Sequence, residues 1–109
     1  MESSLEKKQR VNLLMDCYEE LLTDKQRQYL SLYYDEDLSL SEIADDLNVS
    51  RNAVYDNLKR AVASLEEYEK KLHLLKKHQQ RMDLITRIEE EQGKVNHELN
   101  DYLEMLKKI

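Results

Sequence analysis

The chain contains no proline and a single glycine, Gly93, among its 109 residues. Tryptophan and phenylalanine are also absent, so the seven tyrosines are its only aromatic residues. Proline breaks helices and glycine weakens them, and charged residues make up 37% of the sequence. This composition is typical of an almost entirely helical protein with an extensive exposed surface.

Cysteine and long apolar runs are equally scarce. The one cysteine, Cys17, fits a reducing compartment, and its place between apolar positions of a predicted helix indicates a core thiol. No apolar run is long enough to cross a membrane, and the N-terminus has no signal-peptide core. We therefore expect a cytoplasmic protein without membrane insertion.

Acidic residues exceed basic ones, which gives a net charge of −6. Residues 1–38 hold nine acids and five bases (−4), residues 39–64 four acids and three bases (−1), and residues 65–109 ten acids and nine bases (−1). Proteins that bind nucleic acid through its phosphates usually carry a basic surface. No part of this chain is a general polyanion-binding surface.

Residue patterns of catalysis and of metal binding are missing. The chain has no glycine-rich phosphate loop and no cluster of potential metal ligands. Its histidines, His73, His78 and His97, are spread along the sequence, and the first two are five residues apart rather than the four of a helical ligand pair. We expect no enzyme activity, no cofactor and no metal.

The first 38 residues predict two helices. Apolar residues at spacings of three and four indicate a helix over residues 4–22. Thr23 and Gln26 form a capping box that opens a second helix, which is expected to end near Tyr34. The predicted buried stripe of the first helix consists of Leu5, Val11, Leu14, Met15, Tyr18, Leu21 and Leu22.

Residues 39–61 have the pattern of a helix-turn-helix. Ser39 and Glu42 form a capping box, Asn48 suits a left-handed turn, and Ser50 is a good N-cap for the second helix. The predicted buried positions are Ile43, Ala44, Leu47, Val49, Val54 and Leu58. A helix-turn-helix offers its second helix to the major groove of DNA, although the same geometry also occurs in proteins that bind no nucleic acid.

The outward face of that second helix has residue types that read DNA. Arg51, Asn52, Tyr55 and Lys59 are expected there, and Arg and Asn make bidentate contacts with guanine and adenine edges. Asp56 shares this face and would repel phosphate. We therefore expect weak DNA affinity from one isolated domain.

After Leu58 no stop signal is visible before Gly93, so the second helix of the motif is expected to continue to Gln92. Beyond Gly93 a heptad pattern predicts a further helix. Its seam consists of Val95, Leu99, Tyr102, Leu106 and Ile109. We accordingly divide the chain into a four-helix domain over residues 1–64 and a helical extension over residues 65–109.

The narrow apolar stripes of this extension need a partner, because a lone helix of this kind is unstable in water. The final helix could fold back on the preceding one as a hairpin, or the stripes could pair between two chains. The extension offers little core of its own, which favours a homodimer. Helix-turn-helix proteins also commonly bind DNA as dimers.

The densest basic zone lies beyond the motif. Its residues are Lys70, Lys71, Lys76, Lys77 and Arg81. Alternation of these lysines with Glu66, Glu67 and Glu69 indicates helix-stabilising ion pairs. If the ligand is RNA or a protein rather than DNA, this zone is the expected contact.

Two stretches are specific enough to indicate relatives. Residues 21–61, LLTDKQRQYLSLYYDEDLSLSEIADDLNVSRNAVYDNLKRA, resemble region 4 of bacterial sigma factors. A fuller match, over residues 5–85, is to the small YlxM-like proteins of Gram-positive bacteria and mollicutes. It includes LLTDKQ, the Tyr33-Tyr34 pair, SLSEIAD, VSRNAVYDNLKR and YEKKLHLLKKHQQR. The chain has no sigma region 2, so it is not expected to act as a complete sigma factor.

The resemblance implies an all-α fold, with a sigma region 4-like helix-turn-helix followed by a long C-terminal helix and a helical tail. It implies DNA binding and a regulatory or accessory role in targeting by the signal recognition particle (SRP). The alternative is an accessory protein that binds the SRP RNA or its GTPase. The candidate DNA-binding residues are Ser50, Arg51, Asn52, Tyr55, Lys59 and Arg60.

Overall fold

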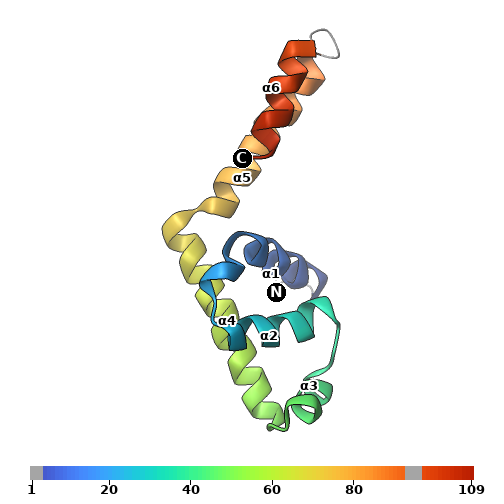
Figure 1. The fold of residues 1–109 in the computed structure, drawn as a ribbon, viewed down its shortest axis with the longest axis vertical. Helices are drawn as coiled ribbons and strands as arrows, with labels where there is room; N and C mark the ends of the chain where they lie inside the picture. Colours follow the sequence, from blue (N-terminus) through green and yellow to red (C-terminus); the bar gives the residue numbers. More distant parts are fainter. Residues whose placement is uncertain (1–3, 93–96) are drawn as a thin grey trace. The chain divides into compact units, whose positions relative to one another are not determined.

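The computed structural model describes residues 4–92 and 97–109, and every regular element in these ranges is helical (Figure 1), which confirms the all-α fold. None of the described helices is both long and apolar enough to span a bilayer. The elements are α1 (Ser4–Tyr18), a 3-10 turn η1 (Glu19–Leu21), α2 (Asp24–Leu30), a π-helical turn η2 (Ser31–Asp35), α3 (Leu40–Leu47), α4 (Arg51–Leu72), α5 (Leu74–Gln92) and α6 (His97–Lys107).

The chain divides into two compact units, Met1–His73 and Leu74–Ile109. The whole of α4 belongs to the N-terminal unit. The predicted boundary, between residues 64 and 65, falls inside this helix.

The core of the N-terminal unit forms where α1, α2 and α3 pack on α4 (Figure 1). Apolar residues at helical spacing on each element point into this core. They are Val11, Leu14, Met15, Tyr18, Leu22, Tyr29, Leu30, Tyr34, Ile43, Ala44, Val54, Leu58, Ala61 and Leu65.

The first helix is shorter than its apolar pattern predicts. It ends at Tyr18, and the chain then tightens into η1. The change of pitch places Leu22 in the core and leaves Leu21 exposed. Leu5 is exposed as well, so the predicted stripe was wrong at these two positions.

The second helix begins as predicted. The Thr23 hydroxyl accepts from the Gln26 backbone N–H at 3.1 Å, and the Gln26 side chain accepts from the Thr23 N–H at 3.0 Å. The α-helix ends at Leu30 rather than near Tyr34, because the next turn widens into η2. The Glu36 N–H donates to the Ser31 carbonyl at 3.0 Å, a span of five residues that defines the π-turn.

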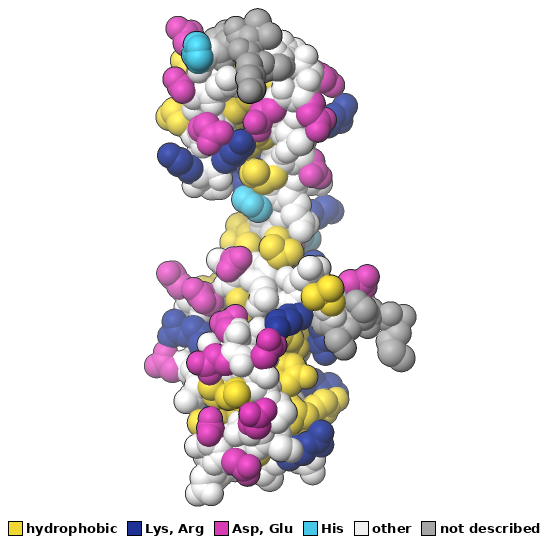
Figure 2. Space-filling model, turned by 90° about the vertical axis from the view of Figure 1, so that its right-hand side faces the viewer, with side chains coloured by type: hydrophobic (Ala, Val, Ile, Leu, Met, Phe, Trp, Pro, Cys, Tyr) yellow, Lys and Arg dark blue, Asp and Glu magenta, His cyan; other side chains and the backbone are white. Residues whose placement is uncertain are grey.

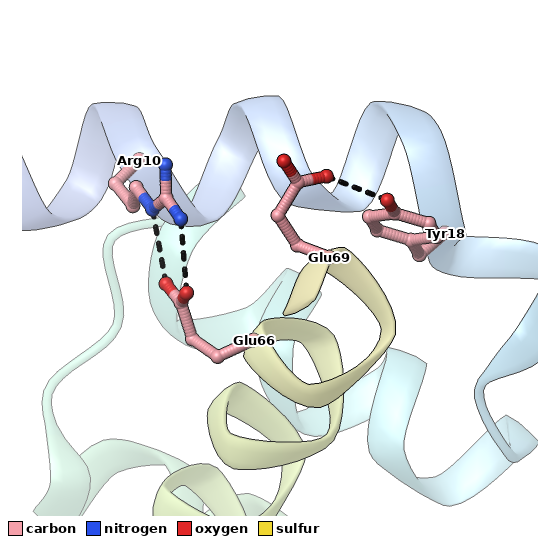
Figure 3. A network of polar contacts seen from close by, with 4 residues as sticks. All are labelled: Arg10, Tyr18, Glu66 and Glu69. Atoms are coloured by element: carbon pink, nitrogen blue, oxygen red, sulfur yellow. Dashed lines mark hydrogen bonds and ion pairs between the residues drawn. The ribbon is translucent and has the colours of Figure 1, made fainter. Parts of the chain in front are cut away.

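Two polar contacts join α1 to α4 (Figure 3). Arg10 donates to both carboxylate oxygens of Glu66, from Nε at 3.0 Å and from Nη2 at 2.9 Å. The Tyr18 hydroxyl donates to Glu69 Oε1 at 2.6 Å, and this pair is buried. The two carboxylates therefore fix how α1 lies against α4.

These contacts correct part of the predicted ion-pair pattern. Glu66 and Glu69 were expected to pair with nearby lysines of their own helix, but their described partners lie on α1. Glu67 does pair with Lys71, one helical turn away, at 3.4 Å. Burial of the α1 packing face explains the difference, because Glu69 is only 7% exposed and a buried carboxylate requires a hydrogen-bond donor.

A continuous helix from the motif to Gln92 was also predicted, and this was wrong. His73 adopts a left-handed conformation (φ 56°, ψ 28°) and ends α4, and its N–H donates to the Glu69 carbonyl at 2.8 Å. Glycine usually occupies such a position. Histidine is among the few other residues enriched there, which is why the sequence contained no obvious stop signal.

In the C-terminal unit α5 and α6 form an antiparallel hairpin. Lys107 Nζ lies 3.0 Å from Glu89 Oε1, and Arg81 Nη1 donates to the Ile109 carbonyl at 3.3 Å. The fold-back alternative is therefore present within one chain, with Ile85 and Leu103 buried. Gly93, the predicted helix breaker, lies outside the described residues.

The helix of the heptad pattern forms, but its buried face differs from the predicted seam. Leu103 is 3% exposed, whereas Tyr102 is 63% exposed and Leu106 is also exposed. Packing against a single neighbour, α5, needs only one narrow stripe, and Leu103 lies on it. The first seam position, Val95, is outside the described residues.

Candidate nucleic-acid interface

The first helix of the motif, α3, is closed at its start by a complete capping box. The Glu42 N–H donates to Ser39 Oγ at 3.1 Å, and the Ser39 N–H donates to Glu42 Oε1 at 3.0 Å. Ile43 and Ala44 are buried against α4, as predicted. The small side chain at position 44 permits close approach of the two helices.

The turn of the motif is built on Asn48, which has the predicted left-handed conformation (φ 55°, ψ 48°). The Val49 N–H then donates to the Ala44 carbonyl at 3.0 Å and closes the end of α3. Val49 itself is 39% exposed, so its predicted burial was wrong.

Ser50 starts α4 as an N-cap, and its hydroxyl oxygen accepts from the Ala53 N–H at 3.0 Å. Val54 and Leu58, four residues apart, are both buried in the core of the unit. Because these two positions hold one face of α4 inward, the opposite face of its first three turns is held toward solvent.

That exposed face carries the predicted DNA-binding set. Arg51, Asn52, Tyr55, Lys59 and Arg60 are all exposed, and Tyr55 retains 54% of its accessible surface. The Ser50 hydroxyl, which accepts the capping bond, still has a proton to donate. The structure thus leaves all six candidates exposed at the N-cap and along the first three turns of one helix.

The cations of this face are Arg51, Lys59 and Arg60. Within residues 4–92 and 97–109, no ion pair holds Arg51, Lys59 or Arg60. Asp56 is exposed beside them, so the outward face has three positive charges and one negative charge. The outward face of α4 thus has a local charge of +2, although residues 39–64 as a whole carry a net charge of −1.

One polar residue of α4 is not available to read bases. The Asn57 side chain donates from Nδ2 to the Ala53 carbonyl at 2.8 Å and is half-buried. Its spacing of four residues to Ala53 on the same helix could have indicated this bond. No sequence pattern indicated a role for Lys7, which lies on α1.

The alternative basic zone falls in both units. Lys70 and Lys71 are in the last turn of α4, whereas Lys76, Lys77 and Arg81 are on α5. Lys71 is paired with Glu67, and Arg81 donates to the Ile109 carbonyl. Lys71 and Arg81 are therefore already engaged within their own units, and Lys76 also has an interaction partner.

Cys17 is half-buried rather than fully buried. Burial, together with the nearby carboxylates of Glu69 and Asp16, raises the pKa of its thiol above the ordinary value. A protonated thiol is a weak nucleophile, so this environment does not activate the cysteine. Among the side chains that the structure describes, no group of three His, Cys, Asp or Glu residues is arranged to hold a metal ion.

Acidic and basic side chains are interspersed on the face drawn in Figure 2, and no continuous basic surface is visible on it. The outward face of α4, with three cations, can neutralise only a few phosphates.

Comparison with known proteins agrees with this geometry. Residues 5–105 match the model of the UPF0122 family, described as "Putative helix-turn-helix protein, YlxM / p13 like". The chain is similar to UPF0122 proteins of Bacillus cereus strain AH187, Bacillus anthracis strain A0248 and Bacillus thuringiensis subsp. konkukian strain 97-27. Each is 52% identical over 108 residues, which covers 96% of this chain and 98% of the relative.

Proposed function

Since the chain belongs to the UPF0122 family of YlxM/p13-like helix-turn-helix proteins, we propose that it is a DNA-binding regulatory protein whose α4 enters the major groove. The observation that carries this proposal is the outward face of α4. Three cations without ion-pair partners among the described residues, Arg51, Lys59 and Arg60, lie there beside the exposed Asn52.

Each residue of this face has a distinct role in the proposal. Arg51 and Asn52, in the first turn, reach base edges, where Arg recognises guanine and Asn recognises adenine. Lys59 and Arg60, two turns later, contact the phosphates that flank the groove, and the Ser50 hydroxyl donates to a phosphate at the helix start. Tyr55 packs its ring against the sugar-phosphate backbone or a thymine methyl group.

Fluorescence anisotropy with labelled duplex DNA from upstream of the protein's own gene tests this role. Each phosphate contact adds about −0.9 to the slope of log affinity against log salt concentration. We expect Arg51→Ala to weaken binding about tenfold, and Lys59→Ala to reduce the slope by about one unit. Arg87→Ala is the matched control, because Arg87 is exposed on α5 without an ion-pair partner in the described ranges.

We further propose that the regulated process is SRP-dependent protein targeting, which the resemblance to YlxM-like proteins supports. The alternative is an accessory protein that binds the SRP RNA or the SRP GTPase through the zone of Lys70, Lys71, Lys76, Lys77 and Arg81. The DNA-binding role is preferred because Lys71 and Arg81 are engaged, whereas the cations of the α4 face are in no described ion pair.

The two roles make opposite predictions. If the alternative holds, Lys70→Glu with Lys77→Glu abolishes binding to labelled SRP RNA or to the GTPase, and Arg51→Ala has no effect. If the DNA role holds, the reverse pattern is obtained with duplex DNA. Binding of SRP RNA alone would remove the support for the DNA-binding regulator.

A homodimer completes this proposal, with the hairpin of α5 and α6 as the contact. Tyr102, Met105 and Leu106 are exposed at i, i+3 and i+4 on α6, so they share one face that is not buried within the unit. Two copies would present two α4 helices to successive half-sites. Light scattering after size-exclusion chromatography should give a dimer mass, and Met105→Glu should give a monomer.

A further inference from the structure

A hollow of about 270 Å³ lies in the N-terminal unit where α1, η2, α3 and α4 meet. Three tyrosines and two lysines contribute to its lining, together with aliphatic side chains of α3 and α4. The tyrosines are Tyr33 and Tyr34 of η2 and Tyr55 of α4, and the lysines are Lys7 of α1 and Lys59 of α4. Residues from distant parts of the sequence thus converge on one small concave surface.

The hollow has an apolar floor and a charged rim. Tyr34 and Leu58 are buried and form the floor, whereas Lys7, Tyr55 and Lys59 are exposed at the mouth. The rings of Tyr33 and Tyr34 meet edge to face, with their centroids 4.9 Å apart. Burial raises the pKa of Tyr34 above the ordinary value of a tyrosine, so its hydroxyl stays protonated to a higher pH.

The two lysines of the rim are in no described ion pair. The next residue along α1, Lys8, pairs with Asp37. Neither Lys7 nor Lys59 has such a partner within residues 4–92 and 97–109. Two ammonium groups beside three tyrosine rings favour a ligand that combines an anionic group with an aromatic ring.

The backbone around the hollow is also unusual. The π-turn η2 supplies two of its tyrosines, and π-turns occur frequently at functional sites. Just beyond it Asp37 has a left-handed φ of 57° although it is not glycine. Uncommon backbone geometry of this kind is retained where surrounding structure or function requires it.

We propose that this hollow binds a free mononucleotide, with the base against the tyrosine rings and the phosphate between Lys7 and Lys59. Its volume is just under the roughly 300–1,000 Å³ of ordinary small-molecule pockets, so it suits one nucleotide rather than a dinucleotide. Base–aromatic stacking tolerates every base, and a lysine binds phosphate as a point charge. The site therefore selects for a phosphate with an attached ring and discriminates little among bases.

Occupancy of the hollow would affect the proposed DNA interface. Tyr55 and Lys59 belong to both surfaces, so a bound nucleotide would compete with DNA for them. This consequence rests on the proposed function, whereas nucleotide binding itself does not. Lys7 belongs only to the hollow and Arg51 only to the DNA-binding set, which allows the two activities to be separated.

Isothermal titration calorimetry of the full chain with AMP, adenosine and inorganic phosphate tests the site. We expect AMP to bind at least tenfold more tightly than either fragment. Lys7→Ala should weaken AMP binding about tenfold, since it removes one charge-assisted contact from an exposed position that does not support the fold. Lys25→Ala is the matched control, because Lys25 is exposed on α2 and does not line the hollow.

Three results would overturn the proposal: no heat of AMP binding at millimolar concentration, phosphate binding as tight as AMP, or AMP affinity unchanged in Lys7→Ala. Circular dichroism verifies that each variant is folded. Anisotropy with duplex DNA separates the two proposals, because Lys7→Ala should leave DNA affinity intact and Arg51→Ala should leave AMP affinity intact. AMP binding without any DNA binding would refute the proposed function and support the nucleotide site.

Discussion

Replacement of Tyr18 by phenylalanine should destabilise the N-terminal unit far more than loss of the neighbouring ion pair. The substitution keeps the fully buried ring and removes only the hydroxyl, which donates to Glu69 at 2.6 Å. Glu69 is itself only 7% exposed, so water cannot replace the lost donor freely. Hydrogen bonds to charged groups contribute about 1.5–3 kcal/mol, and we expect a loss of about 2 kcal/mol of unfolding free energy.

Arg10→Met is the comparison, because Arg10 joins the same two helices. Its two bonds to Glu66 are well formed, but both side chains are nearly half exposed, and exposed ion pairs contribute about 0.2–1 kcal/mol. The long methionine side chain keeps most of the aliphatic packing. The expected loss is therefore below about 1 kcal/mol, and it should shrink further in high salt.

Urea unfolding followed by circular dichroism and tyrosine fluorescence provides the measurement. Six of the seven tyrosines lie in residues 1–73, so the fluorescence reports mainly on the N-terminal unit. A double-mutant cycle of Tyr18→Phe with Glu69→Gln isolates the coupling between the two side chains. The reasoning is refuted if Tyr18→Phe costs no more than Arg10→Met, or if the cycle shows no coupling.

Three further predictions concern the turn, the thiol and the DNA-binding face. Asn48→Ala should lower the free energy of unfolding by about 1 kcal/mol and Asn48→Gly should change it little, because the left-handed backbone penalises a Cβ atom. Equal changes in the free energy of unfolding of the two variants, measured in urea titrations, would contradict this. The Cys17 thiol has a higher pKa in the folded protein than in the unfolded chain. The protonated thiol therefore contributes fully to the free energy of unfolding below the unfolded pKa of about 8.5, and this contribution is lost as the pH rises through the folded pKa. Cys17→Ala should therefore flatten the fall in unfolding free energy above that pH, and iodoacetamide should alkylate the folded thiol more slowly than the unfolded one. Asp56→Asn should raise affinity for duplex DNA several-fold in anisotropy titrations, since it removes the one acid of the exposed α4 face; an unchanged affinity would place the DNA elsewhere.

The helix-turn-helix was predictable because its signals are local. The capping box of Ser39 and Glu42, the left-handed Asn48 and the N-cap Ser50 each depend on residues within three or four positions along the chain. These caps therefore leave a signal that can be read from the sequence without knowledge of any tertiary contact. The orientation of the candidate DNA-binding face followed, because the burial of Val54 and Leu58 fixes the rotation of α4.

The errors came from residues whose state depends on distant partners. Glu69 looks like one acid among many on a helix surface, and only the packing of α1 makes it a buried hydrogen-bond acceptor. In the same way, Leu103 is buried rather than Tyr102 because α5 is the neighbour of α6. Helical periodicity alone cannot choose between adjacent positions when the partner is unknown.

The break at His73 has a different cause. A left-handed conformation costs free energy for any residue other than glycine. Helix propensities therefore predicted that the helix would continue past His73. The approach of Lys7 and Lys59 to one hollow was likewise hidden, because these residues are separated by most of the N-terminal unit in sequence. Local patterns predicted the elements, but not the concave surface between them.

The π-turn η2 has a consequence for how the length of this chain can vary. Tyr29, Leu30 and Tyr34 are all buried. Tyr34 follows Tyr29 by five residues, which is the spacing of a π-turn, whereas residues on one face of an α-helix are three or four apart. Deletion of Leu32 would restore ordinary helical pitch and leave the aromatic ring of Tyr34 on the same buried face. We expect a homologue that is one residue shorter here to keep Tyr34 buried and to present a reshaped surface beside α4.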